Sequence, residues 1–201
     1  SAPEFLSPVS RAAARFAAKV TGKRVLLGYS GGVDSHVLLY ELTRVASMHR
    51  IKIIALHGNH QMLPKSDQWE QHCRQISQKI GVEFRSHRLP VNFDRAGGLE
   101  NVLREARYAW FKSVMNPGDV LATAHHLDDQ VETVLFRLFR GSGVRGLAGI
   151  PSVRKWGKGE LYRPFRDLWR TDIRTFAEHH HLEWVEDESN LDESLDRNFL
   201  R

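Results

Sequence analysis

The stretch that decides the fold of this chain is Ser30-Gly31-Gly32-Val33-Asp34-Ser35. It follows an apolar run over residues 24–29 that is typical of a buried strand, and apolar side chains recur at helical spacing from Val33 to Leu42. The stretch is therefore predicted to form a tight turn between a strand and a helix. Its adjacent glycines allow backbone N–H groups to converge on an anion, and its serines and the helix N-terminus add further donors. These features predict a phosphate-binding loop.

Asp34 adds a carboxylate to this predicted loop. The loop lacks the Lys of a Walker motif, which reaches the β and γ phosphates of a nucleotide. A carboxylate beside a phosphate site is instead suited to a Mg²⁺ that bridges Asp34 and a pyrophosphate. The alternative is an ordinary glycine-rich turn in which Asp34 caps the helix. The complete six-residue string after a strand favours the phosphate site.

The same string resembles the PP-loop of the ATP pyrophosphatase superfamily, whose members split ATP into AMP and pyrophosphate. The resemblance implies adenylation chemistry with ATP and Mg²⁺ as cofactors, on an adenine nucleotide alpha hydrolase-like fold. The residues that it implies for nucleotide binding are Ser30, Gly31, Gly32, Asp34 and Ser35. Asp34 is also the implied metal ligand and a catalytic residue.

Composition limits the class of protein. A length of 201 residues is sufficient for one α/β domain. No apolar stretch reaches the roughly 20 residues that a membrane span needs, and no secretory signal opens the chain, so a cytoplasmic protein without a membrane partner is predicted. The single cysteine, Cys73, excludes an internal disulfide and a Cys-x-x-Cys metal site. Cys73 falls on an apolar helical face, where core packing is its expected role.

The charge is unevenly distributed. A net charge of +5 suggests a polyanionic partner. Residues 137–174 hold ten Lys or Arg against three acids, interleaved with Trp156, Tyr162, Phe165 and Trp169. This composition suits phosphate contacts with base stacking, although a solvated face over an apolar core would look similar. Residues 183–196 then hold seven acids and no Lys or Arg, so residues 141–201 form a looser portion that is first basic and then acidic.

Strands and helices alternate along the chain. Further strands are predicted at residues 51–56, 82–84 and 120–124, with a short extended piece at 161–164. Further helices are predicted at residues 9–20, 66–80, 99–114 and 171–180, and from residue 131 towards Gly141. This alternation predicts a single domain over residues 1–201 built on a doubly wound parallel sheet flanked by helices. Ligands of such sheets bind at the carboxyl ends of the strands.

A second cluster of polar residues lies at another predicted strand end. His125 to Glu132 follow the strand at 120–124, and Asp128, Asp129 and Glu132 are spaced so that a helix brings them near one face. Like charges repel there, and no Lys or Arg lies in the same turn. The cluster therefore suits a cation, either Mg²⁺ or a substrate ammonium. The alternative is a solvent-facing acidic first turn, which the helix dipole favours. His125 either binds a nucleotide or ends the strand.

With these motifs in view, the chain resembles tRNA(Ile)-lysidine synthetases over nearly its whole length. The residues that carry this resemblance, besides the loop, are His57-x-Asn59-His60 with Pro64 and Trp69, Arg104-x-x-Arg107-Tyr108, His125-His126-x-Asp128-Asp129-Gln130-x-Glu132-Thr133, Arg140-Gly141-Ser142-Gly143 with Gly146-Leu147, and Asp187-x-Ser189-Asn190 with Arg197-Asn198. The family usually shows His-Val-Asn-His-Gly where this chain has Gly58 and Gln61. That departure concerns the loop predicted after the second strand.

The resemblance implies a carbon–nitrogen ligase. It would join L-lysine to the wobble cytidine of an isoleucine tRNA with a CAU anticodon, through an adenylated cytidine, and release AMP and pyrophosphate. Asp129 and Glu132 are implied to grip lysine, with Arg197 at its carboxylate. His57, His125 and Arg104 are implied to bind ATP or the adenylate. Arg107 is an alternative to Arg104. Further C-terminal tRNA-binding domains beyond this chain are expected, and a homodimer is one option for its oligomeric state.

Other functions remain open at this point. Another PP-loop adenylating enzyme, similar to GMP or NAD synthetase, would share the loop but not the acid cluster together with the basic segment. A tRNA thiolation enzyme would need catalytic cysteines, which a lone Cys73 does not supply. A module that binds an adenine nucleotide without turnover would have no reason to place Asp128-Asp129-x-x-Glu132 at a neighbouring strand end.

Overall fold

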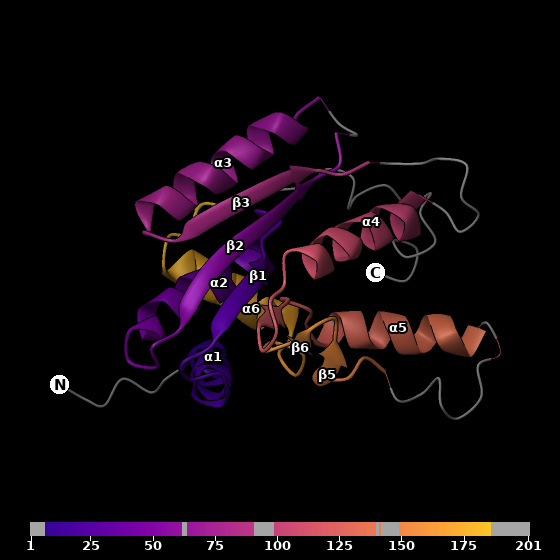
Figure 1. The fold of residues 1–201 in the computed structure, drawn as a ribbon. Helices are drawn as coiled ribbons and strands as arrows, with labels where there is room; N and C mark the ends of the chain where they lie inside the picture. Colours follow the sequence, from indigo (N-terminus) through magenta and orange to yellow (C-terminus); the bar gives the residue numbers. More distant parts are fainter. Residues whose placement is uncertain (1–6, 62–63, 91–98, 140, 142–148, 186–201) are drawn as a thin grey trace.

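The predicted doubly wound sheet is confirmed in a computed structural model, which describes residues 7–61, 64–90, 99–139, 141 and 149–185 (Figure 1). Six strands form one sheet in the order β3-β2-β1-β4-β6-β5. Their bounds are β1 (Arg24–Gly28), β2 (Lys52–Asn59), β3 (Glu83–Arg88), β4 (Val120–Ala122), β5 (Val153–Trp156) and β6 (Gly159–Tyr162). All neighbours pair in parallel except β5, which is antiparallel to β6.

The described residues also form six helices. Their bounds are α1 (Pro8–Lys19), α2 (Val33–Ala46), α3 (Ser66–Lys79), α4 (Leu99–Ser113), α5 (Leu127–Phe139) and α6 (Arg170–His179). Within the described ranges, no helix is both long and apolar enough to cross a membrane. The first turn of α5 carries Asp128 and Asp129, so the acid cluster begins a helix, as predicted.

Alternate residues of the strands supply two separate cores. Val25 and Leu27 of β1 belong to a cluster with apolar side chains of α1, α2 and α6. Leu26, between them, belongs to a second cluster that contains Phe111 of α4 and Met115 just beyond its end. Because successive side chains of a strand point to opposite faces, this division places α1, α2 and α6 on one face of the sheet and α4 on the other. Cys73 packs in the first cluster and is fully buried, which confirms its predicted role.

The second strand is longer than its apolar run. It continues through Asn59, and His57 and Gly58 pair with residues of β3 in parallel register. The loop expected at these residues is therefore a strand. A Cβ at Gly58 would lie 2.7 Å from Leu89 Cδ1, so Leu89 fills the space that a larger residue would need. Gln61 has a φ of 54°, and its N–H donates to Asn59 Oδ1 at 2.9 Å.

A hairpin of β5 and β6 occupies part of the basic segment, where only an extended piece at 161–164 is predicted. The turn uses Gly157, at a φ of 57°, followed by Lys158. Trp156 belongs to the second core cluster and Phe165 to the first, with exposures of 8% and 0%. Base stacking on Phe165 is therefore excluded, whereas Trp169 is 51% exposed.

The turn between β1 and α2 depends on a glycine against a buried sulfur. Gly31 has a φ of 90°, a conformation that residues with a Cβ rarely adopt. A Cβ at this position would lie 2.8 Å from Cys73 Sγ. The Gly31 carbonyl also accepts a hydrogen bond from the Val185 N–H at 3.0 Å. The loop is therefore packed from behind by α3 and by the segment after α6.

We expect Gly31→Ala to destabilise the chain more than Gly22→Ala. Gly22 also has a positive φ, of 75°, but no atom of the described residues lies within 4 Å of the position that its Cβ would take. Gly22→Ala should therefore lower the free energy of unfolding only through backbone strain, by about 1–2 kcal/mol. Gly31→Ala adds overpacking against Cys73, roughly 1–3 kcal/mol more in the free energy of unfolding. Urea denaturation of both variants, alone and with Cys73→Ala, measures the difference. An equal loss in both glycine variants would contradict the contact, as would a Gly31→Ala penalty that Cys73→Ala leaves unchanged.

Candidate active site

The two motifs that sequence analysis placed at strand ends lie at adjacent strands. β1 and β4 are hydrogen-bonded neighbours, with Leu27 opposite Ala122. The loop at 30–35 leaves β1, and the segment at 125–132 leaves β4. β2 lies on the other side of β1, so the strand order reverses between β1 and β4, which is the point where doubly wound sheets bind ligands.

Serine hydroxyls fix the shape of the loop. The Ser30 and Ser35 hydroxyls lie 3.0 Å apart, and the Ser35 hydroxyl donates to the Gly32 carbonyl at 3.1 Å. Two backbone N–H groups, of Ser30 and Gly32, donate to these hydroxyls at 3.2 and 3.3 Å. Gly32 is the N-cap of α2 and supplies no side-chain hydrogen bond. Because the first N–H groups of a helix have no intrahelical acceptor, the start of α2 is suited to an anion.

Asp34 is a largely buried carboxylate that lies close to a histidine and an arginine. Its Oδ2 lies 3.8 Å from His126 Nε2 and 3.8 Å from Arg170 Nε, beyond hydrogen-bond distance. Its Oδ1 is buried and, among the described residues, has no hydrogen-bond partner. Burial raises the pKa of Asp34 above its usual value, although His126 and Arg170 oppose the shift. An incompletely compensated carboxylate of this kind fits a metal ligand.

The donor set indicates which metal it would suit. Within the part of the chain that the structure describes, no three His, Cys, Asp or Glu side chains are arranged to hold a metal ion. Mg²⁺ is commonly bound by one or two carboxylates together with substrate phosphates, not by an all-protein cage. Asp34 beside the anion-binding loop fits that mode, and a structural metal centre does not.

The acids at the start of α5 are partly satisfied by backbone N–H groups. Asp129 Oδ2 accepts from the His126 N–H at 2.9 Å, and Asp128 Oδ2 accepts from the Arg170 N–H at 2.9 Å. These two carboxylates therefore have backbone partners, although no Lys or Arg lies in the same turn. Glu132, on the same helix, is buried with an exposure of 6%. Asp128 serves chiefly to join α5 to the start of α6, whereas Asp129 and Glu132 stay candidates for a substrate cation.

His126 and Arg170 are the site residues that sequence analysis missed. His126 is buried, and its Nε2 lies 3.8 Å from Asp34 Oδ2 and 3.7 Å from Asp129 Oδ2. It therefore connects the two motifs physically. The doubled histidine before the acids was visible in the sequence, but nothing in the sequence distinguishes its two members. Arg170 reaches Asp34 only through tertiary folding, so no local pattern identifies it.

His125 is a neutral histidine beside several arginines. Its Nδ1 lies 2.9 Å from the Thr123 hydroxyl oxygen. Burial lowers the pKa of His125 to about 4; Asp129 opposes this shift, and Arg163, Arg104 and Arg107 reinforce it. The ring is therefore neutral at pH 7. Arg104 and Arg107 of α4 are therefore near enough to disfavour the charged form of His125.

The remaining predicted residues border the site or lie outside the described ranges. His57 is buried at the end of β2, and its Nδ1–H donates to the Tyr29 carbonyl at 3.0 Å, immediately before the loop. Burial lowers the pKa of His57. This hydrogen bond ties β2 to the residue that precedes the loop, which gives His57 a structural role. Contact between His57 and a nucleotide stays a prediction. Arg197 and the acidic segment from residue 186 onward lie outside the described residues.

Comparison with known proteins places this arrangement in a family. The profile of the PP-loop domain matches residues 6–201. The chain belongs to the PP-loop domain family. Membership implies that the chain binds ATP, in agreement with the phosphate-binding role predicted for the loop at 30–35. The predicted superfamily is thereby confirmed.

Individual curated relatives show which PP-loop proteins the chain is similar to in sequence. The PP-loop domain is 43% identical over 175 residues to a tRNA(Ile)-lysidine synthase of Coxiella burnetii, covering 87% of this chain and 39% of that protein. It is 45% identical over 176 residues to the tRNA(Ile)-lysidine synthase of Pseudomonas syringae pv. tomato, again covering 87% of this chain and 39% of the relative. The chain thus spans about two fifths of the length of the curated relatives that it matches.

Two solved structures share the fold. The first is the U34-tRNA thiolase NcsA from Methanococcus maripaludis with its [4Fe-4S] cluster, with a TM-score of 0.71 and 19% identity, covering 89% of this chain and 66% of that one. The second is a glutamine-dependent NAD+ synthetase from Acinetobacter baumannii in complex with ADP, with a TM-score of 0.60 and 18% identity, covering 89% of this chain and 34% of that one. At these identities, the likeness concerns the fold alone.

We expect Asp128→Ala to act on stability. The N-cap of α6, Trp169, supplies no side-chain hydrogen bond, and Asp128 caps the helix from α5 instead. Loss of this cap should lower the free energy of unfolding by about 0.5–2 kcal/mol. Asp167→Ala is the matched control, because its side chain is 79% exposed and its ion pair within the described chain, with Arg166, is long at 3.8 Å. Equal stability of the two variants in urea would contradict the capping role.

We also expect the His125 ring to stay neutral at pH 6. Its pKa of about 4 lies below the ordinary histidine value because burial and nearby arginines disfavour the charged ring. NMR titration of the histidine ring protons measures this directly. Arg104→Ala should raise the His125 pKa and Asp129→Asn should lower it. A wild-type midpoint at 6.5 or above, or shifts of the opposite sign in the two variants, would refute this description of the site.

Proposed function

We propose that this chain is the catalytic domain of a tRNA(Ile)-lysidine synthase, with residues 1–201 as a single PP-loop domain. Its sequence identity to the lysidine synthases supports this proposal. The observation that carries it is the position of His126, which lies against Asp34 of the phosphate loop and against Asp129 of the acid cluster. A site for a leaving pyrophosphate and a site for an arriving cation are therefore adjacent.

In the first step, the cytosine 2-carbonyl oxygen attacks the α-phosphorus of ATP, and the bond to pyrophosphate breaks. The anion-binding start of α2, with Ser30, Gly31, Gly32 and Ser35, holds the departing pyrophosphate. Asp34 would hold Mg²⁺, which neutralises charge on the pyrophosphate when it is bound. Arg104 and neutral His125 bind the nucleotide, with Arg107 as the alternative to Arg104 and His57 at the border of the loop.

In the second step, the lysine ε-amine attacks cytosine C2, the C2–O bond breaks, and AMP leaves with the oxygen. Asp129 and Glu132 hold the amino acid through its ammonium groups, and Arg197 binds its carboxylate. Free lysine has a side-chain pKa of about 10.4, so the ε-amine must lose a proton before it can attack. Asp129 and Glu132, close to the amine, would orient it, accept the proton that it loses and stabilise the positive charge that develops on nitrogen as it attacks.

Partners and location belong to the same proposal. The tRNA substrate is an isoleucine tRNA with a CAU anticodon, and further tRNA-binding domains would follow this one in the whole enzyme. Cytoplasmic location and homodimer formation stay predictions. A GMP or NAD synthetase-like activity is not favoured, because the lysidine synthases are the relatives with high sequence identity. An ATP-binding module without turnover would not explain the acids beside the loop.

The proposal is tested by lysine transfer. We expect the chain, incubated with ATP, Mg²⁺ and labelled L-lysine, to label an isoleucine tRNA with a CAU anticodon. Asp34→Asn should reduce the rate on the order of 10²–10³-fold, because the charge on the departing pyrophosphate is then less well stabilised. Glu132→Gln should raise the KM for lysine. The matched control is Glu178→Gln, an exposed acid of α6 whose change should leave the rate unaltered.

Three results would count against the proposal. Equal labelling of a methionine tRNA with the same anticodon would refute the tRNA specificity. Full activity of Asp34→Asn would show that the phosphate loop has been misassigned. A lysine KM that is unchanged in Glu132→Gln and in Asp129→Asn would remove the acid cluster from the lysine site.

A further inference from the structure

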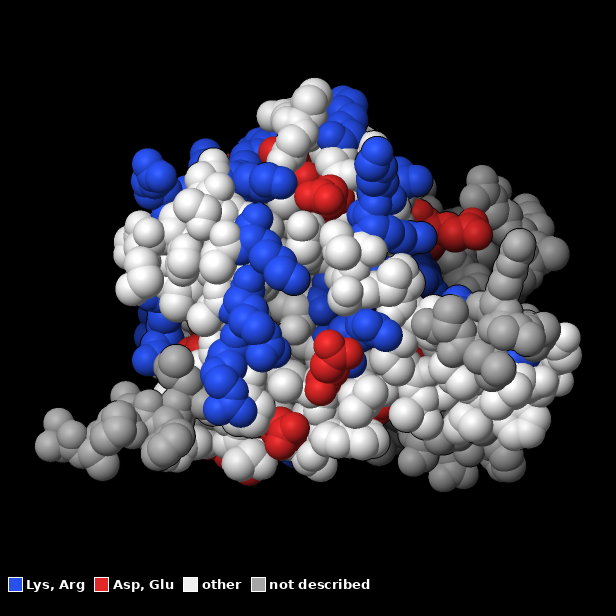
Figure 2. All heavy atoms as spheres, turned by 90° about the horizontal axis from the view of Figure 1, so that it is seen from below, with Lys and Arg blue, Asp and Glu red and all other residues white. Residues whose placement is uncertain are grey.

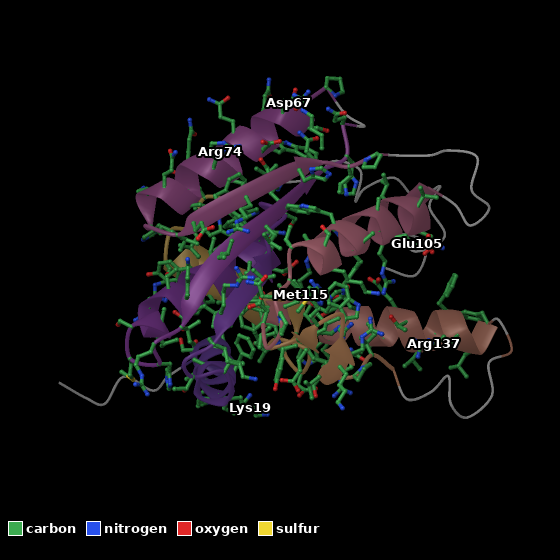
Figure 3. All side chains as sticks on the ribbon, viewed as in Figure 1. Lys19, Asp67, Arg74, Glu105, Met115 and Arg137 are labelled. Carbon is green, nitrogen blue, oxygen red and sulfur yellow. The ribbon has the colours of Figure 1, made fainter. Side chains whose placement is uncertain are left out.

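A pocket lined by arginine and aromatic residues lies between α4 and the β5–β6 hairpin. It encloses about 270 Å³ and is lined by Asn101, Arg104, Glu105, Tyr108, Arg154 and Trp156. Figure 3 shows Met115 near the middle of the molecule and Glu105 further out along the α4 side, so the outer half of the helix provides one wall. Arg154 and Trp156 are two residues apart on β5 and therefore face the same side, towards α4.

A buried arginine adjoins this pocket. Arg163, directly after β6, is 4% exposed, and its Nη1 donates to the Pro151 carbonyl at 2.7 Å. Its Nε is buried and has no hydrogen-bond partner in the described part of the chain. Its backbone N–H donates to the Ser152 carbonyl at 2.8 Å, two residues before Arg154. Burial lowers the pKa of Arg163, and the positive charges of Arg154 and Arg104 lower it further.

The positive charge of this group is not balanced by acids. Across the described residues, neither Arg104, Arg154 nor Arg163 forms an ion pair with a carboxylate within 4.0 Å. The pocket lining holds one acid, Glu105, beside two arginines. Burying an arginine among other arginines is costly unless an anion compensates for it. The group is therefore suited to an anionic ligand.

The aromatic wall gives the pocket a fixed shape. The Tyr108 ring has the Arg104 and Arg107 guanidinium groups 5.8 and 6.0 Å from its centroid. Trp156 meets Tyr108 edge-on at 5.5 Å, and Lys112 Nζ lies 5.2 Å from the Trp156 centroid. Guanidinium groups over aromatic rings are held in place and are a common surface for nucleic acid.

We propose that this pocket binds a backbone phosphate of a single-stranded RNA segment, with Arg154 as the contact. The inference rests on the proposed function, since it names where the tRNA strand adjoining the modified cytidine would lie. In the proposed function, the phosphates of ATP use the loop at 30–35, so a second phosphate site suits the other substrate.

The face of the molecule seen in Figure 2 is predominantly basic, which suits an RNA partner. Figure 2 views the molecule from the side where α1 and β5 lie in Figure 1, and Lys and Arg cover much more of this face than Asp and Glu. A positive face attracts RNA from a distance, whereas the pocket fixes one phosphate. An isolated inorganic phosphate would use the pocket but not the face.

The test is RNA binding by Arg154→Ala. Fluorescence anisotropy with a labelled anticodon stem-loop should show an affinity loss of roughly tenfold, and the slope of log K against log salt should fall by about 0.7 for the lost contact. Arg154→Lys should recover part of the affinity. Lys155→Ala is the matched control, because Lys155 is exposed and its side chain points to the opposite face of β5. Its effect on affinity should be less than twofold.

Further measurements distinguish RNA from inorganic phosphate as the ligand, and distinguish failure of the RNA site from failure of the proposed reaction. Millimolar inorganic phosphate should not displace the RNA, and the ATP affinity of Arg154→Ala should equal that of the wild type. Equal losses of RNA affinity in Arg154→Ala and Lys155→Ala would overturn the pocket, as would a matching loss of ATP affinity or displacement by phosphate. If lysine transfer fails while Arg154→Ala still weakens RNA binding selectively, the proposed reaction is wrong and the RNA site stands.

Discussion

The pairing of β1 with β4 is the constraint on which the rest of the structure depends. Three residue pairs hold these strands in parallel, from Val25 opposite Val120 to Leu27 opposite Ala122. Both strands therefore end at the same edge of the sheet. Because β2 continues the sheet on the far side of β1, the segments leaving β1 and β4 separate at this edge, which is where doubly wound sheets bind ligands. The described residues of the phosphate loop and of the acid cluster follow these two strand ends.

Charge is divided unequally along that edge. On the side of β1, Asp34 and Asp129 face His126, and Arg170 approaches Asp34 without a hydrogen bond. On the side of β6, Arg163 lies among other arginines. Both groups act on the pKa of neutral His125, which Asp129 raises and Arg163 lowers. Acids and arginines that do not neutralise each other at short range would each be stabilised by ligands, a cation for the first group and an anion for the second.

Local sequence patterns determine how much of the fold could be predicted from the sequence. The apolar run before Ser30 and the helical spacing after it depend on neighbours in sequence. The predictions of a strand, a turn and a helix there are therefore all confirmed. The end of β2 was missed because His57 and Asn59 are polar and are held in the strand by pairing with β3. The β5 strand was missed because Val153 to Trp156 include two charged residues and form no apolar run.

The site residues that sequence patterns did not predict are brought into the site by tertiary contacts. Arg170 lies far from Asp34 in sequence, and only the backbone hydrogen bond from Arg170 to Asp128 places it in the crevice. That bond fixes the Arg170 backbone while its guanidinium stays 3.8 Å from Asp34. At this distance, attraction only partly offsets the cost of burying the carboxylate, which is why the pKa of Asp34 stays raised. A divalent cation at Asp34 would remove that cost more fully than Arg170 does, so the unsatisfied state of Asp34 favours ligand binding over stability of the empty fold.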